Sequence, residues 1–408
     1  MTELSTGGGG RELSVLYSFP HALGAPGIGW TAWNQANELV RAGHDVHLVV
    51  ASLARAVEGA ASVHTTLTVA GRRIPHRAVG RDRALRHHDR VAARIVARAA
   101  RGGDRHGIDV VHAWPLAAER TFEAARRAGI ASVREVPNTH TEHAYAVVER
   151  EIARLGLVPR KGASHTRSAR HLRSEQREWA AATALLVPSD SVAQTFRDRG
   201  FDSRRLLRHR YGSNAAPYPR DASARPFTAV FLGRVEPRKG LHFALQAWAG
   251  SLAAQGGRLL VCGHVDAEYL RHLEPLLSAP GVRLCGVTDD PMRVLSEADV
   301  LLLPSVEEGS ALVTYEAQVA GCVPMVSDAA GAVIDEGVTG LTHRVGDVTT
   351  LTRQLDALVT QPEVLRTMQE AAMRRAGELS WTAAAQLQVE AYLAAEHLKV
   401  ELEDAPGR

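Results

Sequence analysis

The sequence predicts an α/β protein with two doubly wound parallel sheets. Its 408 residues are too many for one ordinary core and are enough for two domains. Near-continuous apolar segments of strand length alternate with segments of helix length, which is typical of parallel sheets covered on both faces. A proline-rich stretch, residues 213–226, separates two such series and is the expected linker.

Each expected strand is a short run rich in Val, Leu, Ile or Ala that ends near Gly, Pro, Ser or Asp. In the first series, strands are expected at residues 14–19, 44–52, 108–114, 131–137 and 182–189, and helices at 30–43, 121–129 and 192–200. In the second series, strands are expected at residues 227–234, 257–263, 282–286, 298–305 and 323–328. A last helix, Trp381 to Leu398, is expected to pack back across the linker. The expected domains are therefore 1–215 with 381–408, and 226–380.

Composition excludes several classes of protein. Hydrophobic residues make up 45% and charged residues 23% of the chain, and no apolar run approaches the roughly 20 residues of a membrane-spanning helix. The N-terminus has no secretory pattern, so a cytoplasmic location is expected, with contact at the inner membrane surface as a further option. Three cysteines, Cys262, Cys285 and Cys322, have no metal-like spacing and are expected to be buried thiols in a reducing compartment.

The segment Leu232–Gly240 follows the first strand of the second series and carries two cations, Arg234 and Lys239. The carboxyl end of a strand in an open α/β sheet faces the ligand crevice, and Gly233 and Gly240 allow close backbone approach there. Two fixed cations at a crevice indicate an anionic ligand such as a diphosphate. The alternative is that both are solvated loop residues, as charged side chains usually are.

The segment Val306–Ala317 carries two carboxylates, Glu308 and Glu316. It also follows an expected strand, and the residues after Glu308 are predicted to turn into a helix that continues through Cys322. The spacing of the two glutamates exceeds that of a glycosidase carboxylate pair. They are better suited to accept hydrogen bonds from sugar or ribose hydroxyls. The alternative is a solvated helix N-terminus, which favours glutamate in any case.

These motifs, together with residues 320–341, resemble the retaining glycosyltransferases of family 4. The resemblance extends over nearly the whole chain, from residues 25–50 to the helix at Trp381. It implies the GT-B architecture, in which two Rossmann-like doubly wound domains face a cleft and the C-terminal helix packs back on the N-terminal domain.

The resemblance also implies roles for single residues. Arg234 and Lys239 would hold the donor diphosphate, Glu316 the nucleotide ribose and Glu308 a sugar hydroxyl. Further donor contacts are implied for Gly29, Gly233 and Val287, the last within a segment, Leu284–Val287, that would meet the nucleobase, and for the backbone of Gly309, Ser310, Ala311, Leu312 and Val313. The implied catalytic residues are Arg234, Lys239, Glu308 and His140.

The chain differs from the family pattern at two places. Ser310 and Ala311 stand where the family usually has Phe-Gly, and of an expected Asn-Gly turn only Gly212 is recognisable in residues 211–215. A family histidine that contacts the sugar matches either His140 or His143, and His140 is preferred.

The implied function is transfer of a sugar from a nucleotide-diphosphate sugar, with UDP preferred over GDP, to a hydroxyl group. The acceptor would be a glycan, a lipid-linked glycan or a small natural product. Fixed cations and helix amides would stabilise the charge that develops on the leaving diphosphate. No metal and no cofactor beyond the donor co-substrate are therefore expected, and the chain has no Asp-x-Asp pair of the metal-holding kind.

Two other classes of function compete with this one. Residues 27–32 match a dinucleotide-binding pattern, which would make the protein an oxidoreductase, but residues 20–26 form too long a loop for it and no acidic residue ends the second strand. A binding protein at a membrane surface is the other class. In residues 84–101, Arg86, Arg90, Arg94 and Arg98 share one helix face that could meet anionic lipid or only solvent. No pattern indicates nucleic-acid binding.

Overall fold

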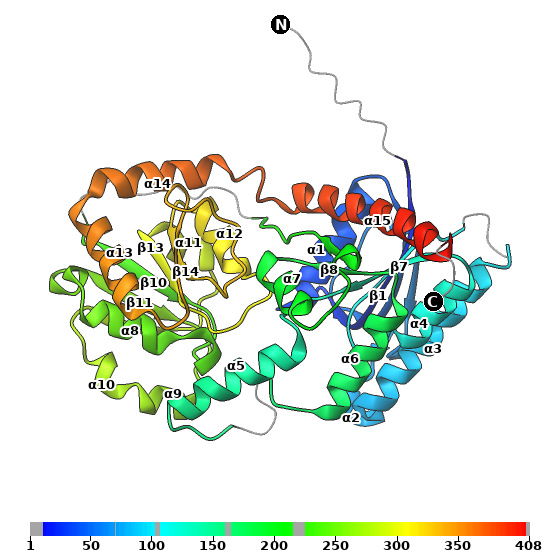
Figure 1. The fold of residues 1–408 in the computed structure, drawn as a ribbon, viewed down its shortest axis with the longest axis horizontal. Helices are drawn as coiled ribbons and strands as arrows, with labels where there is room; N and C mark the ends of the chain where they lie inside the picture. The colour runs from blue at the N-terminus through cyan, green and yellow to red at the C-terminus, as the bar shows by residue number, and fades with distance from the viewer. Residues whose placement is uncertain (1–10, 70, 103–106, 160–164, 215–224, 405–408) are drawn as a thin grey trace, which may run out of the picture. The chain divides into compact units, whose positions relative to one another are not determined.

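The computed structural model describes residues 11–69, 71–102, 107–159, 165–214 and 225–404. Within these ranges the strands form two parallel sheets and a small antiparallel ribbon (Figure 1). Helices lie against both faces of each sheet, so the predicted α/β class with two doubly wound sheets is confirmed.

The first sheet has the strand order β3-β2-β1-β6-β7-β8-β9. Its interior strand β1 pairs in parallel with β2 on one side and β6 on the other. The strands are β1 (Ser14–Leu23), β2 (Asp45–Leu53), β3 (Ser62–Thr65), β6 (Val110–Ala113), β7 (Ala131–Glu135), β8 (Ala184–Val187) and β9 (Leu206–Arg208). Helices in this half are α1 (Ile28–Arg41), α2 (His76–Val79), α3 (Arg81–Ala99), α4 (Glu119–Arg127) and α6 (Ala169–Ala181), and β4 (Thr68–Val69) with β5 (Arg72–Arg73) makes the ribbon.

The second sheet has the order β12-β11-β10-β13-β14-β15, again with parallel pairing. Its strands are β10 (Thr228–Leu232), β11 (Arg258–Cys262), β12 (Val282–Gly286), β13 (Val300–Leu303), β14 (Val323–Ser327) and β15 (Leu341–His343). The helices are α8 (Leu241–Ala249), α9 (Ala267–His272), α10 (Glu274–Leu277), α11 (Pro291–Ser296), α12 (Leu312–Val319), α13 (Val348–Thr360) and α14 (Pro362–Arg374). Short 3-10 turns are η1 (Ser203–Arg205), η2 (Pro237–Lys239) and η3 (Leu252–Gln255). Phe231, Trp248 and Leu302 are fully buried in its core.

The chain divides into two compact units. The first contains residues 1–135, 173–186 and 388–408, and the second contains residues 136–172 and 187–387. Helices α5 (Thr141–Arg154) and α7 (Asp190–Arg197) therefore belong to the second unit, although they follow strands of the first sheet. The expected boundary of folding domains at the proline-rich stretch stays a prediction, and residues 215–224 of that stretch lie outside the described residues.

The last helix, α15 (Trp381–Asp404), is tied into the first unit from Gln388 onward, as predicted for a closing helix. The hydroxyl of Tyr392 accepts a hydrogen bond from Gln388 and lies 2.7 Å from Nδ1 of His112 on β6. Both Tyr392 and His112 are fully buried. Burying these polar groups is tolerated because each has a partner.

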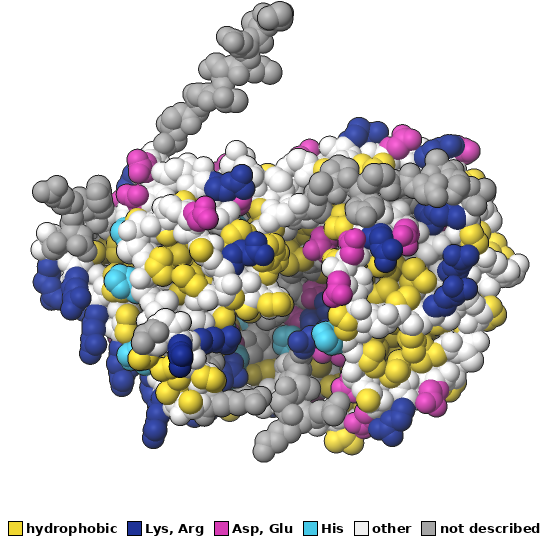
Figure 2. Space-filling view, turned by 180° about the vertical axis from the view of Figure 1, so that it is seen from behind, with side chains coloured by type: hydrophobic (Ala, Val, Ile, Leu, Met, Phe, Trp, Pro, Cys, Tyr) yellow, Lys and Arg dark blue, Asp and Glu magenta, His cyan; other side chains and the backbone are white. Residues whose placement is uncertain are grey.

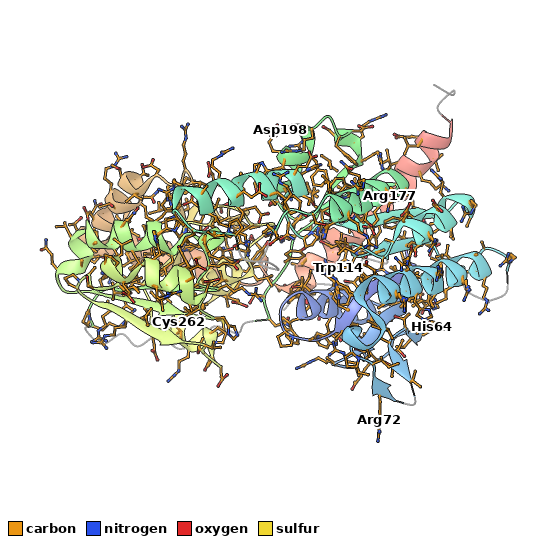
Figure 3. The ribbon with its side chains drawn as sticks, turned by 90° about the horizontal axis from the view of Figure 1, so that it is seen from below. His64, Arg72, Trp114, Arg177, Asp198 and Cys262 are labelled. Carbon is orange, nitrogen blue, oxygen red and sulfur yellow. The ribbon has the colours of Figure 1, made fainter. Side chains whose placement is uncertain are left out.

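A second chain of buried hydrogen bonds joins the strands of this unit to α1. Nε1 of Trp114, labelled inside the first unit in Figure 3, donates to the hydroxyl of Tyr17 at 2.7 Å. That hydroxyl donates to Gln35 at 2.7 Å, and Gln35 donates to Glu135 at 3.2 Å. The core of the first unit is therefore held by directional polar contacts as well as by apolar packing.

Three details differ from the sequence prediction. Strand β1 runs to Leu23, so most of the expected long loop at residues 20–26 is strand. Helix α12 ends at Val319, not Cys322, because Gly321 adopts a left-handed conformation with φ of 68°. Cys285 is exposed on the edge strand β12, whereas Cys262, labelled on the second sheet in Figure 3, and Cys322 are buried.

Helix α3 has the amphipathic arrangement that the sequence indicated. Leu85, His88, Ala92 and Val96 are buried, and Arg86, Arg90, Arg94 and Arg98 are exposed. Figure 2 shows a line of Lys and Arg side chains at the edge of the first unit where α3 lies. Among the described residues, no helix combines the length and the apolar character that crossing a bilayer requires.

Candidate functional site

The loop after β10 and the loop after β13 pack directly against each other in the second unit. Gly240 has φ of 71°, and a Cβ atom there would lie 2.0 Å from the carbonyl oxygen of Pro304. The N–H of Val306 donates to the carbonyl of Arg238 at 2.8 Å. Only glycine permits this approach, which brings the predicted basic motif and the predicted acidic motif to one place.

Lys239 and Glu308 form an ion pair between these two packed loops, which together are called the loop block. Glu308 is only 7% exposed, and it also accepts from Arg238 at 3.1 Å and from the hydroxyl of Ser305 at 3.2 Å. Burial would raise the pKa of Glu308, but the charges of Arg238 and Lys239 hold it below its ordinary value. Glu308 is thus an ionised carboxylate beside two cations.

Arg238 is a site residue that sequence reasoning missed. Its guanidinium contacts Glu236 at 3.1 Å, the carbonyl of Glu307 at 2.7 Å and Glu308 at 3.1 Å. Burial would lower its pKa, but these carboxylates raise it well above the usual value for arginine. In a run of Pro-Arg-Lys the sequence carries no signal for which cation turns inward.

Arg234 lies on the same loop but differs in environment. Its side chain is exposed, and no residue in the described ranges forms an ion pair or hydrogen bond with it. An unpaired guanidinium beside the carboxyl end of β10 is free to contact an anionic ligand, or to stay in solvent.

Glu316 stands on the second turn of α12 and is half-buried. Burial raises its pKa, with no compensating charge or hydrogen bond among the described residues. A carboxylate that is partly removed from water without a donor is destabilised. A ligand hydroxyl would supply the missing hydrogen bond.

The backbone from Gly309 to Val313 is partly committed to other contacts. The carbonyl of Gly309 accepts from Ser189 at 2.6 Å, the hydroxyl of Ser310 donates to Gly331 at 2.9 Å, and the N–H of Ala311 donates to Ala330 at 3.2 Å. Leu312 and Val313 begin α12, and their N–H groups have no acceptor within the described ranges. These two amides are therefore the candidates for an anion at the helix N-terminus.

His140 is the N-cap of α5 and is 6% exposed. Its Nδ1 accepts the N–H of Glu142 at 3.2 Å, and its ring packs edge-on against Phe196. With Nδ1 as acceptor, the ring proton of the neutral form lies on Nε2. His143 is half-buried, and burial followed by the charge of Arg199 lowers its pKa.

The other predicted residues lie around the loop block or outside it. Gly233 directly follows β10, and its carbonyl leaves no room for a side chain at Gly263. Val287 follows β12 and is 57% exposed. Gly29 is in the first unit, where a Cβ atom would lie 2.5 Å from the carbonyl of Ala22. The ligand contacts expected for all three stay predictions.

No group of three His, Cys, Asp or Glu side chains with metal-binding geometry occurs among the residues that the structure describes.

Two protein-family models match the chain. The model described as Glycosyl transferases group 1 matches residues 226–361, and the model described as Glycosyltransferase Family 4 matches residues 26–207. Together the two matches cover well over half of the chain, and each spans most of one sheet.

Similar curated proteins include D-inositol 3-phosphate glycosyltransferases. The one from Nocardia farcinica is 27% identical over 285 residues, which are 64% of this chain and 62% of that protein. The one from Saccharomonospora viridis is 30% identical over 278 residues, 60% of this chain and 62% of that protein. The matched region thus spans somewhat less than two thirds of these relatives.

Solved structures share the fold at low sequence identity. The Anabaena protein Alr3699/HepE in complex with UDP aligns with a TM-score of 0.64 and 16% identity over 93% of this chain and 99% of that chain. Sucrose-phosphate synthase from Thermosynechococcus elongatus aligns with a TM-score of 0.66 and 18% identity over 94% of this chain and 98% of that chain.

Replacing Glu308 with glutamine should flatten the acid side of the stability profile. The pKa of Glu308 is lower in the folded protein than its ordinary value of 4.5. Its ion pairs therefore stabilise the fold above about pH 4.5 and are lost as pH falls through the folded pKa. Urea unfolding between pH 3 and 7 should show a steeper acid loss in the wild type than in E308Q.

The matched control for that measurement is E370Q, because Glu370 is an exposed glutamate of α14 with no role in the site. E370Q should keep the wild-type slope. Equal acid slopes for the wild type and E308Q would contradict the assignment.

Proposed function

Because the chain belongs to the family 4 glycosyltransferases and has the GT-B fold, we propose that it is a retaining, metal-independent enzyme. It transfers a sugar from a nucleotide-diphosphate sugar to an acceptor hydroxyl. The donor nucleotide is UDP in preference to GDP. The acceptor is a glycan, a lipid-linked glycan or a small natural product.

The observation that carries this proposal is the environment of Glu316. A half-buried carboxylate with a raised pKa and no donor in the described ranges suits a ligand that brings hydroxyl groups. The ribose of a nucleotide presents two adjacent hydroxyls, which one carboxylate can accept together. The amides of Leu312 and Val313, four and three residues before Glu316, have no acceptor within the described ranges and suit the phosphates of the same ligand.

Cleavage of the donor places negative charge on the departing diphosphate. Arg234, Lys239 and the amides at the start of α12 provide positive charge that is already in position, so little reorganisation is needed as the bond breaks. In a retaining reaction the acceptor hydroxyl attacks from the face that the diphosphate leaves, and the phosphate takes its proton. Neither a metal ion nor a separate general base is then needed.

Lys239 is paired with Glu308. We propose that the diphosphate takes over the ammonium group and that Glu308 then accepts a sugar hydroxyl. Arg238 stays with Glu308 and Glu307, which keeps the carboxylate ionised during the exchange.

The comparisons suggest ligands without deciding among them. One structure that shares the fold is a complex with UDP. The similar curated proteins are named for D-inositol 3-phosphate, which is a cyclitol phosphate. We therefore include a phosphorylated cyclitol among the small acceptors to be tested.

The donor should be identified by thermal stabilisation against UDP, GDP, their sugar conjugates and nicotinamide dinucleotides, each with and without EDTA. A ligand at 100 times its dissociation constant stabilises the native state by about 2.7 kcal/mol, which raises the melting temperature by a few degrees. We expect a UDP species to do so, and the shift to survive EDTA. A shift with nicotinamide dinucleotides alone would instead favour an oxidoreductase that uses residues 27–32.

The variants E316Q and K239M should weaken nucleotide binding without unfolding the protein. E316Q loses the charged acceptor for the ribose, and K239M loses a cation for the diphosphate; each should raise the dissociation constant for UDP about tenfold, which is about 1.4 kcal/mol. Isothermal titration calorimetry measures this directly. E370Q is again the control, and unchanged affinity in E316Q would remove Glu316 from the site.

We also propose that the arginine face of α3 gives peripheral contact with anionic membranes. Arg86, Arg90, Arg94 and Arg98 are exposed at four-residue spacing, where like charges repel unless an anion lies nearby. The protein should float with vesicles that contain anionic lipid at moderate salt, and not with neutral vesicles. Replacing the four arginines with alanine should abolish flotation; equal flotation of the variant would assign the face to solvent.

A further inference from the structure

Glu307 is a fully buried carboxylate that contacts three separate segments of the second unit. Its Oε1 accepts from the backbone N–H of Thr139 at 3.0 Å and from the Thr139 hydroxyl at 2.7 Å. Its Oε2 lies 3.0 Å from Nε2 of His165 and 3.4 Å from Nη1 of Arg238. It is the neighbour of Glu308 and lies outside the pair of glutamates that the family resemblance assigns.

The side chain of Glu307 keeps its negative charge in this environment. Burial would raise its pKa, but the hydrogen bond and charge of His165, the charge of Arg238 and the Thr139 hydroxyl hold the pKa far below its usual range. Removing one partner of such a buried charge costs much more than removing an exposed pair. The Glu307 carboxylate therefore holds Thr139, His165 and Arg238 in place.

Glu307 holds the N-terminal end of α5, and a different glutamate holds the other end. Thr139 and the N-cap His140 begin the helix beside Glu307. Near the C-terminal end, Glu151 lies 2.8 Å from Nε2 of the buried His242, which bonds Tyr269 through Nδ1 at 2.6 Å. Within the described ranges, the ion pairs of Glu151 are with Arg154 and His242 and include neither Glu308 nor Lys239, so the two ends can be perturbed separately.

We propose that Glu307 is a positioning residue that sets the spacing between the His140 turn and the Glu308–Lys239 pair. On one side it fixes the backbone of Thr139, one residue before His140. On the other side its carboxylate contacts Arg238 at 3.4 Å, and Arg238 also contacts Glu308. Its effect on turnover rests on the proposed function, because His140 and Glu308 would contact the donor sugar from opposite sides of Glu307.

The first test measures the geometry without any ligand. In E307Q the amide oxygen can still accept from Thr139, but the amide N–H₂ then faces His165 and Arg238, which are donors themselves. Amide hydrogen exchange over residues 138–143 should therefore be at least tenfold faster in E307Q than in the wild type. In the matched variant E151Q, faster exchange should appear near residues 150–156 and not at 138–143.

The second test separates positioning from general stability. With a donor that the wild type uses, E307Q should lower kcat about tenfold or more, while the dissociation constant for the sugar-free nucleotide stays within twofold. E151Q should lower the melting temperature to a similar extent and keep kcat within twofold. T139V, which removes only the hydroxyl contact, should lower kcat about threefold. It replaces E307Q in both tests if E307Q does not fold.

Two outcomes would overturn the proposal. One is unchanged exchange at residues 138–143 in E307Q, or in T139V if only that variant folds. The other is a loss of kcat that E151Q reproduces, because α5 would then matter only for stability. A wild type that transfers no sugar would refute the proposed function, and the exchange measurement would still decide whether Glu307 positions the turn.

Discussion

The geometry of the candidate site in the second unit depends on the cluster of charges around Arg238. One guanidinium contacts Glu236, Glu307 and Glu308, and so joins the loop after β10 to the loop after β13. An isolated buried charge would be very costly, but here every charged group has opposite charges beside it. The close approach of Gly240 to Pro304 makes this arrangement possible, because any side chain there would force the loops apart. The same close approach of the two loops places Lys239 beside Glu308.

Much of the fold could be predicted because burial leaves a strong pattern in sequence. Parallel strands such as β10 and β13 are buried on both faces, so they read as unbroken apolar runs. Because the carboxyl ends of parallel strands meet at one edge of a sheet, Arg234, Lys239 and Glu308 could be predicted to lie at the same edge, and the structure has them in the loops after β10 and β13. Exposure of Cys285 could not be predicted in this way, because β12 is an edge strand and its apolar residues look like those of a central one.

The connections within the site were beyond prediction from sequence. Glu307 and Glu308 are adjacent and chemically identical, yet one contacts Lys239 and the other contacts Thr139, 168 residues away in the chain. The sequence carries no signal for such a distant partner. His140 likewise looked like a ligand residue, and the structure adds that it caps α5, which a histidine seldom does. Side-chain direction at a loop is decided by tertiary contacts that no local pattern encodes.

The place of α15 in the first unit has a consequence for how the chain is made. Tyr392 and Gln388 complete a buried hydrogen-bond network with His112, although the whole second sheet lies between them in sequence. During synthesis the earlier strands emerge from the ribosome long before their last partner. The first unit must therefore wait with part of its interior open until Gln388 and Tyr392 have been synthesised, and a fragment that stops before Gln388 would lack a piece of its own core.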